Sequence, residues 1–271
     1  MDAARFRAFE IAGWAAVADA YHGALGPVTA RLVEPLLDAA GAGPRTRLLD
    51  VACGPGYVAR RAADRGARSV ALDIVHGVAR LAARLHPGLP VACADGERLP
   101  FPDAAFDAVV SGFGIGHLVG PEAAVAEWAR VARPAGRIAV TWWDAPERSA
   151  FPGIFVRALE DCRVALPSGV PEGPPMLRFS SDEELAKLLT GAGLRGPRVD
   201  RVAFLHHVPS AAALWDGAIA GTVRLRATVL GQTDEVQARI RRAFERRLAA
   251  HRAGGGFAIP ISVKVASAER A

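Results

Sequence analysis

Three acidic residues at the ends of short apolar runs are the first residues in this sequence that suggest chemistry. Asp50, Asp73 and Asp95 each stand at or near the end of one of three consecutive runs. If the runs are parallel strands, their carboxyl ends meet at one edge of a sheet, where α/β proteins bind ligands. Carboxylates there accept hydrogen bonds from hydroxyl and amino groups and attract cationic groups. The spacing therefore predicts one site for a ligand that carries such groups.

A glycine-containing loop follows the first run. Residues 50–56 read DVACGPG, and residues 54–59, GPGYVA, fit the G-x-G-x-x-A pattern of dinucleotide-binding turns. Glycines at this place let the backbone approach a ligand and present amide groups at a helix N-terminus. Asp50 beside the loop would repel a pyrophosphate and attract a cationic ligand. The carboxylate therefore disfavours a nicotinamide dinucleotide.

Helices and short apolar strands alternate around these residues. Strands are expected over residues 47–51, 69–72, 91–94, 106–111 and 137–142, with helices over 2–20, 28–41, 56–65 and 121–132 and another that runs to residue 84. This alternation predicts an α/β fold in which a doubly wound, Rossmann-like parallel sheet is covered by helices on both faces.

The pattern changes after the fifth strand. Helices are expected over about 150–163, 181–190, 210–219 and 233–252, a Pro-rich loop over 167–175, and two more strands over 198–205 and 258–265. We expect three parts: an N-terminal helical lid at 1–44, a ligand-binding core at 45–145, and a segment at 146–271 that completes the sheet. A helical cap at about 206–256, inserted before the last strand, would cover a substrate pocket.

Four segments carry a resemblance to a known family. They read LLDVACGPG, ALDIV, ADGERLPFPDAAFDAVVSGFGIGHL and AVAEWARVARPAGRIAVTWW, and together cover much of residues 45–143. The chain resembles the class I S-adenosylmethionine-dependent methyltransferases, in the branch similar to the ubiquinone-biosynthesis type and to bacterial natural-product enzymes. Ala52 replaces the first glycine of the family's D-x-G-C-G-x-G pattern, and Ala135 replaces one glycine of its R-P-G-G turn. The resemblance implies a seven-stranded, mostly parallel sheet with an antiparallel last strand.

The resemblance also implies S-adenosylmethionine as cofactor and S-adenosylhomocysteine as product. It assigns the loop to the methionine part, Asp73 to the ribose and Asp95 to the adenine, and it places aromatic residues of the lid against the cofactor. Trp14 and Tyr21 are the matching aromatic residues, although packing within the lid would explain them equally. The residues expected around the cofactor are Trp14, Tyr21, Asp50, Ala52, Gly54, Gly56, Asp73, Ile74, Asp95, Gly96, Glu97, Ser111 and Gly112.

Methyl transfer is an in-line displacement, and a general base helps if the acceptor is a hydroxyl. His117 matches the second position of a His-His pair common in the family, whose first position is Gly116 here. Tyr21 and His207 are further candidates, although His206 and His207 also fit an exposed strand edge. Six large residues could line an apolar acceptor pocket or belong to the protein core: Trp142, Trp143, Phe151, Phe155, Met176 and Trp215.

Composition limits the other possibilities. Hydrophobic residues make up 51% and charged residues 23% of 271, and no apolar run approaches the ~20 residues that span a bilayer. We expect a cytoplasmic protein, a monomer or a homodimer, with no metal and no membrane partner. The formal charge of +5 comes from arginine, since Lys187 and Lys264 are the only lysines. The densest arginine clusters are 224/226 and 239–247, and the second lies on an expected helix that also carries Glu235 and Glu245. Because the net charge is also modest for a chain of this size, nucleic acid is not expected. Cys93 and Cys162 are predicted to be small buried residues.

The main hypothesis is methyl transfer to a small aromatic or apolar bacterial metabolite. One alternative is an NAD(P)-dependent oxidoreductase, which the glycine loop alone permits but which lacks a Tyr-x-x-x-Lys pair. Another is an RNA or protein methyltransferase. Nucleic-acid amino-methylating enzymes carry an Asn-Pro-Pro-Tyr-like segment where this chain has residues 111–114, SGFG. A relative that binds the cofactor but catalyses a cyclisation is the last alternative.

Overall fold

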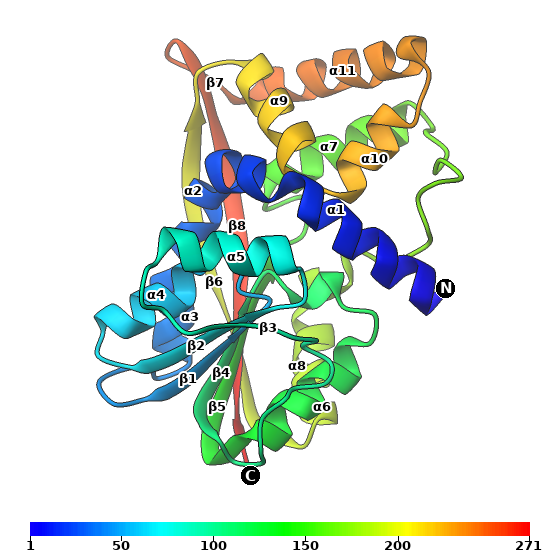
Figure 1. The fold of residues 1–271 in the computed structure, drawn as a ribbon. Helices are drawn as coiled ribbons and strands as arrows, with labels where there is room; N and C mark the ends of the chain where they lie inside the picture. The colour runs from blue at the N-terminus through cyan, green and yellow to red at the C-terminus, as the bar shows by residue number, and fades with distance from the viewer.

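A single sheet runs through the molecule and carries the predicted site at one edge (Figure 1). The computed structural model describes residues 1–271. The strand order is β3-β2-β1-β4-β5-β8-β6, and a short β7 pairs with β8. The strands are β1 (Arg47–Val51), β2 (Arg68–Asp73), β3 (Val91–Cys93), β4 (Phe106–Gly112), β5 (Ala132–Trp143), β6 (Leu194–Val208), β7 (Arg252–Ala253) and β8 (Gly256–Arg270).

Strand directions follow the prediction. Neighbouring strands among β1 to β5 pair in parallel, and β8 runs antiparallel to both β5 and β6. Apart from the two-residue β7, this is the mostly parallel sheet with an antiparallel last strand that the sequence predicted. The strand order reverses between β1 and β4, and such a switch point is where doubly wound folds bind ligands.

Helices cover both faces of the sheet. The helices α3 (Val33–Ala39), α4 (Tyr57–Asp64) and α5 (His76–Leu85) pack on one face, and α6 (Pro121–Val131) and α8 (Asp182–Gly191) on the other. The remaining helices are α1 (Ala3–Ala24), α2 (Gly26–Thr29), α7 (Ala150–Asp161), α9 (Ala211–Gly221), α10 (Arg224–Leu230) and α11 (Asp234–Leu248). None of these helices is both long enough and apolar enough to cross a lipid bilayer.

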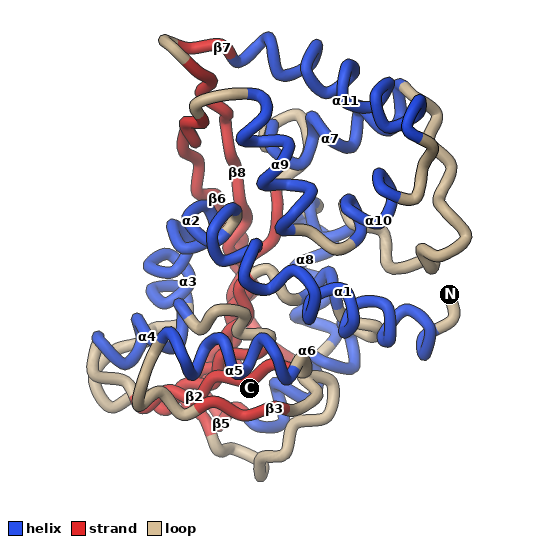
Figure 2. The backbone as a smooth tube through the Cα atoms, turned by 45° about the horizontal axis from the view of Figure 1, so that its top comes forward, coloured by secondary structure: helices blue, strands red, loops and turns tan.

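The N-terminal helix α1 crosses the carboxyl edge of the sheet. It lies between α5 below and α9 and α10 above (Figures 1 and 2), and it packs against both α5 and α9. Its Asp2 cap accepts a hydrogen bond from the Arg5 backbone N–H at 3.1 Å. Phe6 and Val17 are buried on its inner side. The helix therefore forms one wall of whatever space lies above the strand ends.

The helices α7, α9 and α11 lie beside the long ends of β6 and β8 (Figure 2), and an aromatic cluster packs between them. Phe155 of α7 stacks on Phe244 of α11 with ring centroids 4.8 Å apart. Trp215 of α9 lies 5.2 Å from Phe244. Aromatic rings at such separations contribute beyond the area they bury, so the cluster fixes α7, α9 and α11 to one another.

Lys264 of β8 is an almost fully buried cation, with 1% of its surface exposed. Its Nζ contacts the carboxylate of Asp182 and lies 3.5 Å from that of Asp144. Asp144 is itself buried and accepts a hydrogen bond from Ser262 at 2.8 Å. A buried charge is tolerated only when it is paired in this way. Of the two cysteines predicted to be buried, Cys162 is, but Cys93 is exposed because it closes the short strand β3.

Candidate functional site

A cavity of about 550 Å³ lies above the carboxyl ends of the strands. The glycine loop, the ends of β2 and β4, helix α1, the Pro-rich loop and the start of α10 line it. Most of the predicted cofactor residues line this cavity: Trp14, Tyr21, Ala52, Gly54, Asp73, Ile74, Asp95, Gly96, Glu97 and Gly112. Asp50, Gly56 and Ser111 lie outside the cavity lining.

The glycine loop turns through three residues with positive φ: Ala52 (54°), Gly54 (54°) and Gly56 (81°). Gly54 faces open space, whereas a Cβ on Gly56 would lie 3.1 Å from Ala82 of α5. Gly54 is therefore the glycine that leaves room for a ligand, and Gly56 lets α4 and α5 approach each other. Ala52 adopts this backbone although left-handed geometry costs a residue with a Cβ about 1–2 kcal/mol.

Asp50 lies beneath the loop and not within the cavity. Its Oδ2 accepts a hydrogen bond from the Ala59 backbone N–H at 3.0 Å, and its Oδ1 is buried without a partner. Burial, opposed by that hydrogen bond and supported by the charge of Asp73, raises the pKa of Asp50 to about 7. Its field can favour a cation bound above the loop, but the carboxylate does not reach the cavity surface.

Asp73 reaches the cavity from the end of β2. Its two oxygens accept hydrogen bonds from the backbone N–H groups of Gly54, at 3.1 Å, and Val75, at 2.9 Å. Burial raises the pKa of its carboxyl to about 6, although both backbone hydrogen bonds lower it. Each carboxylate oxygen keeps a further lone pair for a ligand hydroxyl.

Asp95 and Glu97 share a cation from the lid. Arg7 of α1 contacts the carboxylate of Asp95, and it donates to Glu97 Oε2 at 2.9 Å. The other oxygen of Glu97 accepts from the Val119 backbone N–H at 2.9 Å. Helix α1 is thus tied to the acidic side of the cavity through one arginine.

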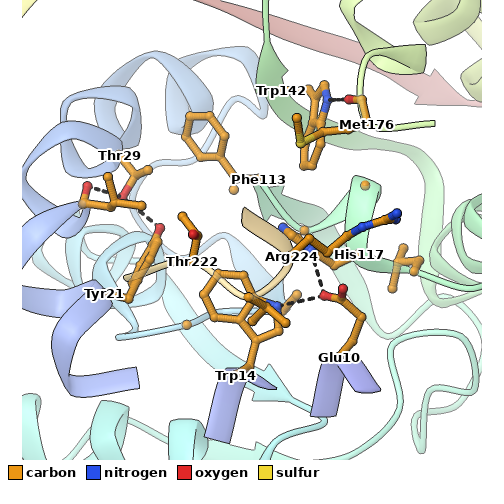
Figure 3. A pocket seen from close by; sticks show the side chains of 18 of the residues that line it. Glu10, Trp14, Tyr21, Thr29, Phe113, His117, Trp142, Met176, Thr222 and Arg224 are labelled. Atoms are coloured by element: carbon orange, nitrogen blue, oxygen red, sulfur yellow. Dashed lines mark hydrogen bonds and ion pairs between the residues drawn. The ribbon is translucent and has the colours of Figure 1, made fainter. Parts of the chain in front are cut away.

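His117 and Glu10 lie side by side in the lining of the cavity (Figure 3). Glu10 Oε2 lies 3.0 Å from His117 Nδ1 and also accepts a hydrogen bond from Trp14 Nε1 at 3.0 Å. Only 5% of Glu10 is exposed, and its Oε1 has no partner. Sequence reasoning missed Glu10, because a carboxylate on an N-terminal helix usually belongs to a solvated face.

The other two base candidates lie in different surroundings. The Tyr21 hydroxyl hydrogen bonds to Thr29 Oγ1 at 3.0 Å, and burial raises the pKa of Tyr21 to about 12. Tyr21 lines the cavity, but at neutral pH it stays protonated. His207 is exposed on β6 opposite Ala258 and does not line the cavity. The structure therefore brings only His117 and Tyr21 together with the cofactor residues.

Glycines 114 and 116 allow close packing beside His117. A Cβ on Gly116 would overlap the ring of Trp142, and one on Gly114 would overlap Ser111 Oγ. Trp142 occupies the space that the first histidine of the family's His-His pair would need. These two glycines therefore make room for Trp142 and Ser111, and they do not simply enlarge the cavity.

The opposite wall of the cavity is apolar and aromatic. Of the six residues proposed for an acceptor pocket, Trp142, Trp143, Phe151, Phe155 and Met176 line the cavity, and Trp215 does not. Trp142 is held by a hydrogen bond from its Nε1 to the Met176 carbonyl at 2.9 Å, and Phe113 lies 4.7 Å from Trp143. Such a wall can bind a flat or apolar molecule beside the polar residues.

Sequence comparison gives the family. The methyltransferase domain family matches residues 49–140. The demethylmenaquinone methyltransferase of Beutenbergia cavernae is 33% identical over 168 residues, which cover 59% of this chain and 70% of that protein. That of Mycolicibacterium paratuberculosis is 32% identical over 168 residues, which cover 59% and 72%. The chain belongs to the class I S-adenosylmethionine-dependent methyltransferases.

Solved structures share the fold of this methyltransferase. The YcgJ protein of Bacillus subtilis has a TM-score of 0.57 at 18% identity, covering 89% of this chain and 98% of its own. The [4+2]-cyclase SpnF has a TM-score of 0.54 at 21% identity, covering 89% and 81%. At these identities the likeness concerns the fold alone. Membership of the methyltransferase family resolves the ambiguity of the glycine loop between two cofactors.

Proposed function

We propose that this methyltransferase methylates a hydroxyl group of a small aromatic or apolar molecule. The observation that carries the proposal is the Glu10–His117 pair, which lies in one cavity with the glycine loop and an aromatic wall. The relatives are named for demethylmenaquinone, which supports a small-molecule acceptor for this chain.

The residues present fit the cofactor. Gly54 faces open space at the loop, and Asp73 and Asp95 follow the next two strands and face the same cavity. We assign the methionine part to the loop at Ala52 and Gly54, within the field of Asp50. We assign the ribose to Asp73 with Ile74 beside it, and the adenine to Asp95 and Glu97. Gly96, Gly112 and the lid residues Trp14 and Tyr21 would complete the contacts, since they line the same space.

His117 is proposed as the general base. Because Glu10 can accept a hydrogen bond from Nδ1–H, it holds the imidazole in the tautomer whose Nε2 is free to take a proton. The acceptor hydroxyl would give that proton to Nε2 as its oxygen becomes nucleophilic. When bound, the sulfonium of the cofactor supplies the activated methyl group. The aromatic wall and helix α1 orient the acceptor and exclude water, which supplies much of the rate in a displacement.

Calorimetry and a methyl-transfer assay test this proposal. We expect S-adenosylhomocysteine to bind and NADH not to bind. We also expect radiolabelled methyl groups to pass from S-adenosylmethionine to members of a panel of phenols and naphthols, with His117→Ala slower by about 10²–10⁴-fold, the usual range for a lost acid or base. Tight NADH binding, or transfer that His117→Ala leaves unchanged, would contradict the proposal.

A further inference from the structure

Arg224, at the start of α10, is the cation of the cavity wall that has no acidic partner. The charged residues that line the cavity are Arg7, Glu10, Asp73, Asp95, Glu97 and Arg224. Arg7 is paired with two carboxylates. The side chain of Arg224 makes no ion pair and no hydrogen bond within the protein, and its guanidinium lies over an aromatic ring. Its side chain appears among the cavity residues in Figure 3.

The position of this guanidinium is defined by two neighbours. Its Cζ lies 5.8 Å from the ring centroid of Phe6, which is fully buried. A Cβ on Gly173 of the Pro-rich loop would overlap Arg224 Nη1. The side chain reaches the cavity between helix α1 and this loop because residue 173 is a glycine. A guanidinium held in this way has lost part of its rotational freedom before any ligand arrives.

We propose that Arg224 binds a carboxylate of the acceptor, which makes the substrate an aromatic or apolar hydroxy acid. This inference rests on the proposed function, because it places the acceptor in the same cavity. A partly desolvated cation is costly unless it is paired, and a guanidinium can hold a carboxylate through two parallel hydrogen bonds. The apolar wall then binds the body of the molecule, and Arg224 fixes the direction in which it lies.

The carboxylate of the cofactor itself is the other possible source of this chemistry. The length of α1 favours the carboxylate of the acceptor over that of the cofactor as the group that Arg224 binds. Arg224 lies over Phe6 near the start of the helix, whereas His22, near its end, hydrogen bonds to Tyr57 beside the glycine loop. Phe6 and His22 are separated by about 24 Å along an α-helix. The methionine carboxylate, which belongs near that loop, is therefore far from Arg224.

The test is calorimetry on the full chain saturated with S-adenosylhomocysteine. The probes are 4-hydroxybenzoate, 1-hydroxy-2-naphthoate, 3-hydroxy-2-naphthoate and 6-hydroxy-2-naphthoate, each paired with its methyl ester. We expect at least one acid to bind more than tenfold more tightly than its ester, since a hydrogen bond between charged groups is stronger than one between neutral groups. In Arg224→Gln this preference should fall to less than twofold, while the ester binds as before.

Matched variants separate the possible outcomes. Arg226→Gln changes an exposed arginine two positions away and should leave the preference intact. Gly173→Ala should reduce it, because the new methyl group displaces the guanidinium. The proposal is overturned if no acid binds better than its ester. It is also overturned if Arg224→Gln weakens the binding of S-adenosylhomocysteine, because Arg224 would then belong to the cofactor site. Failure of S-adenosylhomocysteine to bind the unmodified chain would instead contradict the proposed function.

Discussion

Glu10 Oε2 and His117 Nδ1 lie 3.0 Å apart and join residues 107 positions apart in the sequence. The contact links helix α1 to the short turn after β4, so the position of the histidine depends on how α1 packs beside the cavity. An imidazole that shares its Nδ1 proton with a carboxylate has a defined orientation and a free Nε2. The proposed proton transfer therefore depends on the contact between α1 and this turn.

Glu10→Gln should lower kcat by about 10²-fold and leave the affinity for S-adenosylhomocysteine within twofold. Trp14 Nε1 and His117 Nδ1 both contact Oε2, so the amide oxygen can still accept from both. The neutral amide, however, no longer stabilises the imidazolium that forms when His117 takes the proton. Steady-state rates and calorimetry on the same samples provide the measurement.

Two further variants check this reasoning. Glu10→Gln combined with His117→Ala should be no slower than His117→Ala alone, since residues that act as a unit are not additive. His207→Ala, on an exposed strand position, should leave kcat unchanged. If kcat falls equally in His117→Ala and His207→Ala, neither histidine is the base.

The affinity for S-adenosylhomocysteine should rise as pH increases from 5 through about 7, and level off only above the pKa of Asp50. Burial raises the pKa of Asp73 to about 6 and of Asp50 to about 7. Only the ionised forms attract the ammonium group and accept two ribose hydroxyls, so the protons must leave before tight binding. Calorimetry across this range gives the profile. In Asp73→Asn the step near pH 6 should disappear, and an unaltered profile in that variant would refute the assignment.

Asp50→Asn should stabilise the ligand-free protein by an amount that grows with pH. Because burial raises the pKa of Asp50 from 3.8 to about 7, the folded state holds a proton there that the unfolded state has lost between these values. The unmodified protein therefore loses stability through this group as pH rises across that window. The amide variant has no such loss. Urea unfolding of both proteins at pH 4.5, 6 and 7.5 measures the difference, which should be largest at the highest pH.

Ala135→Gly should raise the free energy of unfolding by about 1 kcal/mol, because left-handed backbone is unfavourable for alanine. Ala135 has φ 59° in the turn before the apolar part of β5, and it stands where the family has glycine. Ala52→Gly, with φ 54°, should act in the same direction. The control is Ala238→Gly at an exposed position in α11, which should lower stability by about 0.5–1 kcal/mol. A loss at position 135 as large as at 238 would contradict the strain argument.

Gly116→Ala should destabilise the protein by about 1–3 kcal/mol, the usual cost of overpacking. The added methyl group overlaps Trp142, which cannot rotate away without losing its hydrogen bond to Met176. Gly77→Ala in α5 meets no atom within 4 Å and should be neutral or stabilising. Thermal unfolding of the two variants measures the contrast, and equal melting temperatures would show that Trp142 adapts freely.

Local signals predicted the parallel core of the fold well. The predicted strand 47–51 is the observed β1: its first residue, Arg47, is exposed, and the leucines and valine that follow are buried. The outer antiparallel strands are longer than predicted, because polar residues such as Arg195 and Glu269 pair with each other beyond the apolar stretch. Such pairing depends on a distant partner and leaves no hydrophobic pattern. Helix α10 was missed because it is short and no side chain caps it.

The candidate site was predictable where it follows strand ends and unpredictable where it depends on the lid and cap. Asp73 and Asp95 reach the cavity as parallel topology requires. Asp50 shares the pattern but lies below the loop, because the first turn of α4 offers it a backbone N–H. Glu10 and Arg224 carry no local signal, since each faces the cavity only through the packing of its helix against distant elements.

The burial of Lys264 has a practical consequence for labelling this protein. Because Lys264 is buried and paired with Asp182, Lys187 on α8 is the one exposed lysine. An amine-reactive fluorophore should therefore couple at Lys187, at an exposed position on α8. Because α8 packs against β6 and β8, this single label would report on the sheet without any engineered cysteine.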